Sequence, residues 1–333
     1  KPEKFSLDKI NTKAWNLFRY ANFMALEDDT WQSITLGEGM TPIVNFDDHV
    51  MLKMDYMMPT LSFKDRGAAV LVSHCKSIGV TSVVQDSSGN AGNSVAAYAA
   101  KAGIDCQIFV PEGTSPKKIA MIESHGASVE VVPGSRDHCA DVCRGKVEAE
   151  GAYYANHVYN PYFYEGTKTY IYEIYEQLGR IPEHLFIPLG NGTLFIGAVL
   201  ALEHLLDSGV INHFPKILAV QSTHCDPFVQ AYLNKSPEPA IVEPKPTMAE
   251  GIAIGIPMRG KEILEMVYRH NMEVIVAPEE TILAARLALA EQGVYCEHTT
   301  AASYAAYLAY CEKNGPTPDS LLSMCGAGLK SDK

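Results

Sequence analysis

A lysine on the inward face of a predicted helix is the first residue that could do chemistry. The stretch PTLSFKDRGAAV, residues 59–70, predicts a helix start, with Ser62 as the N-cap and Asp65 in the first turn. Helical spacing back from the apolar residue Leu71 places Lys64 on the same face. A lysine in this position is either a nucleophile for a carbonyl group, or a packed stem whose ammonium group reaches water.

The loop SSGNAG, residues 87–92, lies between a predicted strand and a predicted helix. In open parallel sheets, ligands bind outside the carboxyl ends of the strands. The glycines of this loop let backbone N–H groups approach an anion, and Asn90 adds a side-chain donor. The alternative is a turn with a helix cap, which many α/β proteins have.

A second loop, LGNGT at 189–193, also joins a strand to a helix. Gly190 and Gly192 leave the N–H groups of 191–194 open to a phosphate, and the Thr193 hydroxyl adds a donor. No Gly-Lys-Ser/Thr follows and the GxGxxG spacing is absent, so the loop has no nucleotide signature. A tight turn is the alternative.

The third loop is MCGAGLK, residues 324–330, where Cys325 ends a predicted strand beside a pair of glycines. A small core thiol is the alternative reading of this cysteine. Pyridoxal phosphate accounts for all of these features together. It needs a lysine for its Schiff base, a cradle for its phosphate, a donor for its ring hydroxyl and a partner for its ring nitrogen. An imine at Lys64 would also avoid the cost of a buried ammonium group.

Alternating strands and helices must position these loops. Strands are expected at 82–88, 106–110, 128–132, 184–190, 216–222, 273–278 and 320–328. Helices are expected at 92–103, 115–126, 137–151, 166–179, 193–209, 278–293 and 299–315. Strands separated by helices of this length predict βαβ units and parallel sheets, hence an α/β fold.

Composition restricts the partners. The chain of 333 residues has a net charge of −12 and no block of Lys or Arg, so a nucleic-acid partner is not expected. No uninterrupted apolar run approaches the length of a membrane span, and no apolar signal segment begins the chain, so we expect a cytoplasmic location. The cysteines are scattered without a CxxC pair. Cys139 and Cys143 could form a two-thiolate clip but are better explained as buried residues, and no metal site is expected.

The motifs together resemble the threonine synthase and serine/threonine dehydratase group of tryptophan-synthase-β-like, fold type II pyridoxal-phosphate enzymes. SFKDRG is similar to the lysine motif of that family, SSGN to its asparagine loop and LGNGT to its phosphate loop. Further similar stretches, in the family's order, are the entry segment at 19–44, NPYFYEGTKT at 160–169 and CGAGLK at 325–330.

The resemblance implies a role for each matching position. Lys64 would form the Schiff base and then act as general base and acid, Phe63 would pack near the ring, and Asn90 would bind the ring hydroxyl. Cys325 would face the ring nitrogen as a neutral partner, which suits elimination and replacement chemistry. The loop residues that would hold the cofactor phosphate are Gly190, Asn191, Gly192, Thr193 and Leu194. The residues that would hold the substrate carboxylate are Ser87, Ser88, Gly89, Asn90 and Ala91.

Two positions depart from the family pattern. A threonine usually follows SSGN, and an arginine in NPxRxEG holds the substrate's own phosphate, but this chain has Ala91 and Phe163 there. An apolar ring cannot replace a charge-assisted, bidentate contact. His157, Tyr162 and Tyr164 could rebuild a polar pocket. Alternatively, the pocket takes an uncharged or amino-bearing side chain.

The resemblance also implies the architecture and the reaction. It implies two open, twisted, mainly parallel sheets flanked by helices, with residues 1–55 and 165–333 forming a large domain and 56–164 a small one. The leading hypothesis is a lyase of threonine synthase type that acts on O-phosphohomoserine or a related amino acid. A serine/threonine dehydratase or diamino-acid ammonia-lyase is the second hypothesis, and a non-catalytic pyridoxal-phosphate-binding regulator is a third. A nicotinamide dehydrogenase is disfavoured without GxGxxG. A small amino-acid substrate and a homodimer are the expected partners.

Overall fold

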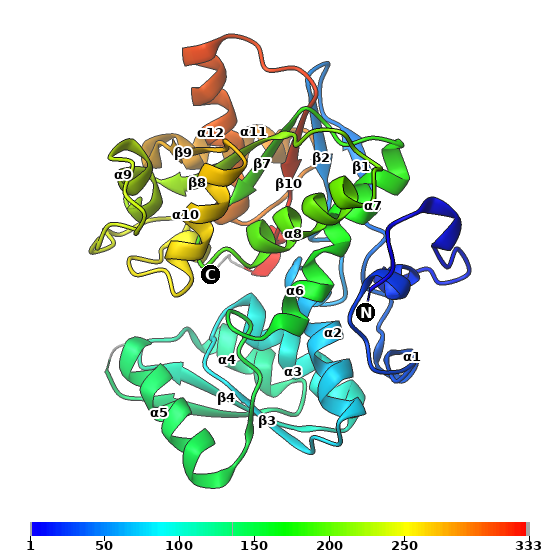
Figure 1. Ribbon diagram of the computed structural model, residues 1–333. Coiled ribbons are helices and arrows are strands. Elements are labelled where there is room, and N and C mark those ends of the chain that lie inside the picture. The colour runs from blue at the N-terminus through cyan, green and yellow to red at the C-terminus, as the bar shows by residue number, and fades with distance from the viewer. Residues whose placement is uncertain (1, 135, 331–333) are drawn as a thin grey trace.

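Two open sheets form the framework of the protein, a computed structural model that describes residues 2–134 and 136–330 (Figure 1). The larger sheet has the strand order β1-β2-β10-β7-β8-β9, and only the β1–β2 pair is antiparallel. Its strands are β1 (Ile43–Asn45), β2 (Val50–Lys53), β7 (His184–Pro188), β8 (Lys216–Ser222), β9 (Glu273–Ala277) and β10 (Ser320–Ser323). The smaller sheet is parallel throughout, in the order β5-β4-β3-β6. Its strands are β3 (Ser82–Gln85), β4 (Asp105–Pro111), β5 (Ser128–Val132) and β6 (Tyr153–Tyr154).

Helices cover both faces of both sheets, which confirms the predicted α/β class. The α-helices are α1 (Trp31–Ile34), α2 (Lys64–Ser77), α3 (Asn90–Ala102), α4 (Pro116–Glu123), α5 (Arg136–Glu150), α6 (Pro161–Thr167), α7 (Thr169–Leu178), α8 (Thr193–Asp207), α9 (Pro227–Leu233), α10 (Gly260–Arg269), α11 (Ile282–Glu291) and α12 (His298–Asn314). Short 3-10 segments are η1 (Leu7–Lys9), η2 (Leu17–Phe23), η3 (Glu250–Ile252), η4 (Glu279–Thr281) and η5 (Gly328–Lys330). Within the described ranges, no helix is both long and apolar enough to cross a bilayer.

The strand alternation decides which helices cover which face. In β4, Ile108 and Val110 pack against α3 and α4, whereas Phe109 between them packs against α5 on the opposite face. In β7, Leu185 and Phe186 point likewise into different core clusters, one on the α7–α8 side and one on the α11–α12 side. Because side chains alternate along a strand, apolar residues at consecutive positions indicate a sheet buried on both faces.

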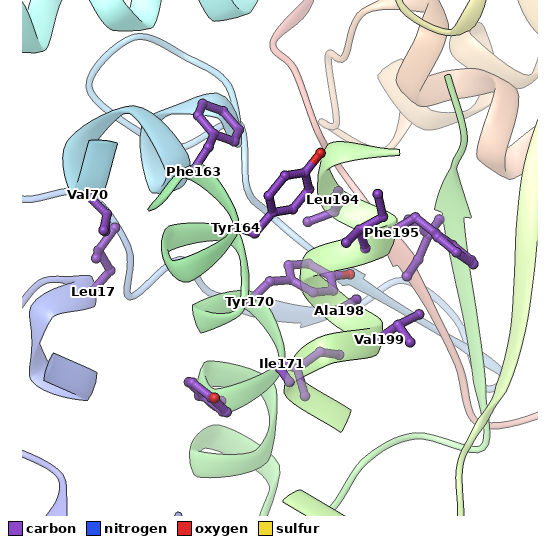
Figure 2. Packing of buried hydrophobic residues seen from close by; sticks show 14 of the residues in the cluster. Leu17, Val70, Phe163, Tyr164, Tyr170, Ile171, Leu194, Phe195, Ala198 and Val199 are labelled. Atoms are coloured by element: carbon purple, nitrogen blue, oxygen red, sulfur yellow. The ribbon is translucent and has the colours of Figure 1, made fainter. Parts of the chain in front are cut away.

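The helices α2, α6 and α8 lie between the two sheets and carry the core across the junction (Figure 1). Figure 2 shows Tyr164 of α6 pointing toward Leu194 in the first turn of α8, and Val70 of α2 against Leu17. Helices α2 and α6 approach each other closely at a glycine. A Cβ atom added at Gly67 would lie 2.4 Å from ring atoms of Phe163. The position of Phe163 beside the start of α2 therefore depends on this glycine.

A buried group of charges fixes α2 to the larger sheet. Arg66 of α2 makes two 2.8 Å hydrogen bonds to the Asp55 carboxylate and contacts Glu173 of α7 at 2.9 Å. Lys53 of β2 contacts the same glutamate at 2.5 Å, and all four side chains are fully buried. Two cations thus face two anions, which is the condition under which buried charges are tolerated. Since Arg66 is two residues from Lys64, this cluster also fixes the beginning of the helix that carries the lysine.

Two local predictions were wrong. The helix expected at 166–179 begins earlier and is interrupted at Lys168, because Asn160 caps the first part and Pro161 occupies its first position. The hydroxyl of Thr169 donates to the Gly166 carbonyl at 2.6 Å, a contact that bends helices. Ser62 does not cap α2. It pairs with Gly326 in a β-bridge instead, and Phe63 is the N-cap.

Candidate active site

The Lys64 side chain joins the start of α2 to the start of α8. Its Nζ atom lies 2.6 Å from the Thr193 hydroxyl oxygen. The same atom lies 4.6 Å from the ring centroid of Phe63 and 5.7 Å from that of Phe163. The lysine therefore points toward the phosphate loop, between two aromatic rings, with its side chain half-buried. This placement favours the nucleophile over the reading in which the ammonium group reaches bulk water.

Two short backbone pairings bring the lysine segment, the cysteine segment and the start of α12 together. The Phe63 N–H donates to the Cys325 carbonyl at 2.9 Å. The Glu297 N–H donates to the Gly326 carbonyl, also at 2.9 Å. The glycine pair at the end of β10 thus lies between two segments that are more than two hundred residues apart in the chain. These pairings place Lys64, Cys325 and Glu297 around one point at the edge of the larger sheet.

The phosphate loop connects β7 to α8 and is built from close backbone contacts. Gly192 has φ +77°, and a Cβ atom there would lie 2.6 Å from Ile263. A Cβ atom at Gly190 would lie 3.0 Å from the Gly251 carbonyl oxygen. The loop then leads into α8 at Thr193, where the first N–H groups of the helix have no intrahelical partner. An anion is stabilised at such a helix end by these N–H groups and by the helix dipole.

The predicted phosphate-loop residues differ in how they are engaged. Thr193 contacts Lys64, whereas the Asn191 side-chain oxygen accepts from the Met258 N–H at 3.3 Å. Leu194 is buried in the first turn of α8. The assignment of these residues to a cofactor phosphate stays a prediction.

The asparagine loop ends in a second helix start, that of α3 at Asn90. The Ser87 N–H donates to the side chain of Gln85 at 2.8 Å, which holds the beginning of the loop. A Cβ atom at Gly92 would lie 1.8 Å from the Ser87 carbonyl oxygen, so only glycine fits there. The N–H groups at this helix start are suited to a carboxylate, as predicted for 87–92, although no bound anion tests that role.

Glu297 is a site residue that the sequence reasoning missed. It is the N-cap residue of α12, and its carboxylate accepts from the Asn90 side-chain amide at 3.2 Å. Burial raises the pKa of Glu297, while the Asn90 amide and the charges of Lys330 and Lys64 oppose that rise. The signal that could have found it is a lone acidic residue before a helix of small side chains, EHTTAAS, at 297–303.

Cys325 lies at the end of β10 as predicted, and its side chain is buried. Burial raises the pKa of the Cys325 thiol well above its ordinary value, and the charges of Asp55 and Glu297 raise it further. The thiol is therefore a neutral group at physiological pH. Cys139 and Cys143 pack in the core beneath α5 with Val84 and Phe109, so the structure favours buried residues over a two-thiolate clip.

The polar groups expected around Phe163 are not all at the site. Tyr162 stacks on His74 with a centroid separation of 3.5 Å and bonds to Glu27, on the outer side of α6. His157 lies with its ring centroid 5.8 Å from that of Phe163. The Tyr164 hydroxyl donates to the Val158 carbonyl at 2.5 Å. Tyr162 therefore does not contribute to a polar pocket.

The site fits pyridoxal phosphate. A glycine-built anion cradle lies at the start of α8, and a lysine amine reaches the first residue of that helix. Asn90 and Cys325 provide an amide donor and a neutral thiol on the other sides of the lysine segment. In the described part of the chain, no group of three or more His, Cys, Asp or Glu side chains is arranged to hold a metal ion.

Comparison with known proteins decides the family. Residues 34–326 match the family model described as pyridoxal-phosphate dependent enzyme. The chain belongs to this family. Pyridoxal phosphate is accordingly its cofactor, and the predicted recognition of the family is confirmed.

Several sequence relatives of this pyridoxal-phosphate dependent enzyme are threonine synthases. That of Methanocaldococcus jannaschii is 29% identical over 314 residues, which cover 91% of this chain and 77% of the relative. That of Synechocystis is 30% identical, covering 93% and 82%, and that of Mycobacterium leprae is 32% identical, covering 84% and 78%. These relatives indicate a lyase.

Solved structures of the same fold support the two-sheet architecture. Maize serine racemase has a TM-score of 0.75 at 21% identity and covers 91% of this chain and 94% of its own. The processed form of threonine deaminase isoform 2 from Solanum lycopersicum has a TM-score of 0.78 at 19% identity, covering 98% and 86%. At these identities the similarity concerns the fold, and the fold type II prediction is confirmed.

Proposed function

We propose that this enzyme converts O-phosphohomoserine, or a closely related amino acid with a leaving group at the β or γ carbon, by elimination followed by addition of water. The observation that carries the proposal is the 2.6 Å contact between Lys64 Nζ and the Thr193 hydroxyl, which holds the amine at the mouth of the phosphate cradle. The threonine synthases among the relatives supply the reaction class.

When bound, pyridoxal phosphate acts as the electron sink for negative charge that develops at the α carbon of the amino acid. The Lys64 amine is the group that takes the α proton and returns it, because its Nζ atom lies within the site and is oriented by Thr193. The N–H groups at the start of α3 bind the substrate carboxylate. Phe63 and Phe163 exclude water from the amine. The neutral Cys325 thiol leaves the ring nitrogen without a cationic proton, which favours elimination over transamination.

A dehydratase that releases a 2-oxo acid and ammonia is the second candidate. The specific observation in its favour is Phe163, which is fully buried at the position where the family's arginine holds the substrate phosphate. An apolar ring there suits serine or threonine better than a phosphate ester. A bacterial threonine deaminase, from T.th., shares the fold, with a TM-score of 0.71. A non-catalytic binder is a third candidate, although the position of Lys64 argues for chemistry.

One titration distinguishes these candidates. The purified holoenzyme is mixed in turn with O-phosphohomoserine, threonine, serine and diaminopropionate, and the cofactor absorbance and the products are followed. Release of threonine and phosphate from O-phosphohomoserine supports the proposal. A 2-oxo acid and ammonia formed only from unphosphorylated amino acids would assign the dehydratase reaction, and no product from any of them would favour the binder. A cytoplasmic location and a homodimer are further parts of the proposal.

A further inference from the structure

Arg259 lies near the candidate site, although no sequence motif points to it. The residue precedes α10, and its guanidinium carbon lies 4.6 Å from the ring centroid of Tyr164. We propose that Arg259 binds the distal phosphate monoester group of the amino-acid substrate, in place of the arginine that Phe163 replaces. This inference rests on the proposed function, because it assigns a residue to the leaving group of that reaction.

The first step of the argument is the path from the lysine to the arginine. Lys64 Nζ lies 5.7 Å from the Phe163 ring, and Tyr164 is the next residue of α6. Figure 2 shows the Tyr164 ring directed toward Leu194 at the beginning of α8, on the same side as the phosphate loop. Arg259 packs on this ring from the opposite element. The cation is therefore separated from the reactive amine by the side chains of two consecutive aromatic residues, at the end of the site away from the asparagine loop.

The second step is the attachment of the Arg259 segment to the phosphate loop. The Met258 N–H donates to the Asn191 side-chain oxygen at 3.3 Å. Ile263, one turn into α10, lies where a Cβ atom at Gly192 would meet it at 2.6 Å. These contacts fix the start of α10 against the loop on both sides of Arg259. The arginine is thus placed by the same backbone that forms the anion cradle, and its distance from that cradle varies little.

The third step is the orientation of the guanidinium group. Glu262 accepts from Nε at 2.6 Å and from Nη2 at 2.5 Å, so two of the five N–H donors of Arg259 are engaged by this carboxylate. The arginine side chain is 22% exposed and the glutamate side chain 40% exposed, so the cation lies on the inner side of the pair. The Tyr164 hydroxyl also interacts with the arginine, which opposes the burial that raises the pKa of Tyr164 to about 12.

The fourth step is the chemistry of the ligand. A planar guanidinium fork matches the oxygen geometry of phosphate, and an arginine remains charged at any working pH. A doubly charged phosphate ester can accept from the remaining donors while Glu262 continues to hold the other edge. A serine or threonine hydroxyl is too short and has no charge to reach this cation. Arg259 therefore discriminates in favour of substrates that carry an anionic group beyond the γ carbon.

The test compares Arg259→Gln with Arg269→Gln in the holoenzyme. Arg269 lies at the other end of α10, is 59% exposed and contacts only Glu203 among its ion pairs in the described residues, so it controls for loss of a cation on this helix. The dissociation constants of O-phosphohomoserine, of homoserine and of pyridoxal phosphate are measured by calorimetry. We expect about a 10- to 100-fold weaker affinity for O-phosphohomoserine in Arg259→Gln, as for loss of a charged hydrogen bond. Homoserine and cofactor affinities should stay within about twofold, and Arg269→Gln should match the wild type.

Other outcomes overturn the inference. Equal weakening for homoserine would mean a structural role, and weakening for pyridoxal phosphate alone would place Arg259 at the cofactor phosphate. If the wild type releases threonine from O-phosphohomoserine and Arg259→Gln binds it equally well, the inference fails while the proposed function stands. If the wild type does not bind O-phosphohomoserine and forms a 2-oxo acid from serine or threonine, both fail. Partial recovery of affinity in Arg259→Lys would support a cation that binds an anion.

Discussion

The Asn90 side-chain amide lies 3.2 Å from the Glu297 carboxylate, and this contact joins the two halves of the protein at the candidate site. Asn90 begins α3, which follows a strand of the smaller sheet, and Glu297 caps α12, which packs on the larger one. The asparagine is also the residue expected to bind the cofactor's ring hydroxyl. We infer that the carboxylate orients the amide until the ring hydroxyl engages it, so Glu297 acts as a positioning residue.

The raised pKa of Glu297 gives a prediction about pH. Because burial raises the pKa, the folded chain binds this proton more tightly than the unfolded chain does. The stabilising contribution is complete below the ordinary pKa of 4.5 and is lost as the pH rises through the raised value. In cofactor-free protein, Glu297→Gln should therefore gain stability relative to the wild type between about pH 4 and about pH 8.

Urea unfolding of both proteins across that range measures the difference. The exposed residue Glu123 supplies the control, since Glu123→Gln should change stability equally at both ends of the range. A Glu297→Gln difference that is constant with pH, or that favours the wild type as the pH rises, would contradict the burial of this carboxyl group.

The close contact at Gly92 predicts a loss of substrate binding. In Gly92→Ala the new methyl group would lie 1.8 Å from the Ser87 carbonyl oxygen, so the asparagine loop must rearrange. We expect stability to fall by about 1–3 kcal/mol, as for overpacking, and amino-acid affinity to fall with it. Gly145 is the matched control, since it lies exposed within α5 with nothing near its Cβ position. Gly145→Ala should stabilise the protein by roughly 0.5–1 kcal/mol. Normal amino-acid affinity in Gly92→Ala would show that the loop conformation is not required.

The buried charge cluster predicts a large loss of stability. Glu173→Gln leaves Lys53 and part of the Arg66 guanidinium without their carboxylate, which should cost about 3–5 kcal/mol. Although burial by itself raises the pKa of Glu173, Arg66 and Lys53 lower it below the ordinary 4.5. Its contribution is therefore present above pH 4.5 and decreases as the pH falls through the lowered pKa.

Thermal and urea unfolding test this cluster. The wild type should lose stability on acidification more steeply than Glu173→Gln. Glu148→Gln, at an exposed position of α5, should change stability by less than about 0.5 kcal/mol. A Glu173→Gln variant as stable as this control would show that the cluster does not hold α2 in place.

A neutral partner at Cys325 predicts tolerance of one substitution and not of another. Cys325→Ser keeps a small, uncharged donor at the end of β10, so most activity and the cofactor spectrum should be retained. Cys325→Asp would place a carboxylate beside the ring nitrogen, and elimination should slow relative to transamination side products. Comparison of product ratios and spectra checks both variants. Loss of all activity in correctly folded Cys325→Ser would contradict the assigned role.

Much of the site was predictable because it follows from short motifs at strand ends. Lys64, Asn90 and the glycines of the phosphate loop each stand at the boundary of a regular element, where spacing and residue type carry the information. The strands β5 and β8 were predicted with their observed bounds, 128–132 and 216–222. Ser115 caps α4 as predicted, accepting from the Lys118 N–H.

The remainder depends on contacts between segments far apart in the chain. Ser62 resembles an N-cap locally, but pairing with Gly326 removes it from that role. Glu297 and Arg259 follow no recognisable motif, and only the folding of α12 and α10 onto the two loops brings them to the site. The boundaries predicted for the two domains, at 55/56 and 164/165, stay a prediction, as do the ligands of the individual site residues.

The most direct test of the account is the visible absorbance of purified holoenzyme and of Lys64→Ala reconstituted with pyridoxal phosphate. The account predicts an absorption band of the lysine-bound cofactor in the wild type, and its loss in Lys64→Ala with the fold retained by circular dichroism. Thr193→Val, which removes the hydroxyl beside Lys64 Nζ, should keep the band and lower the rate. A band that persists unchanged in Lys64→Ala, or that is absent from reconstituted wild type, would contradict the central claim that Lys64 is the reactive amine.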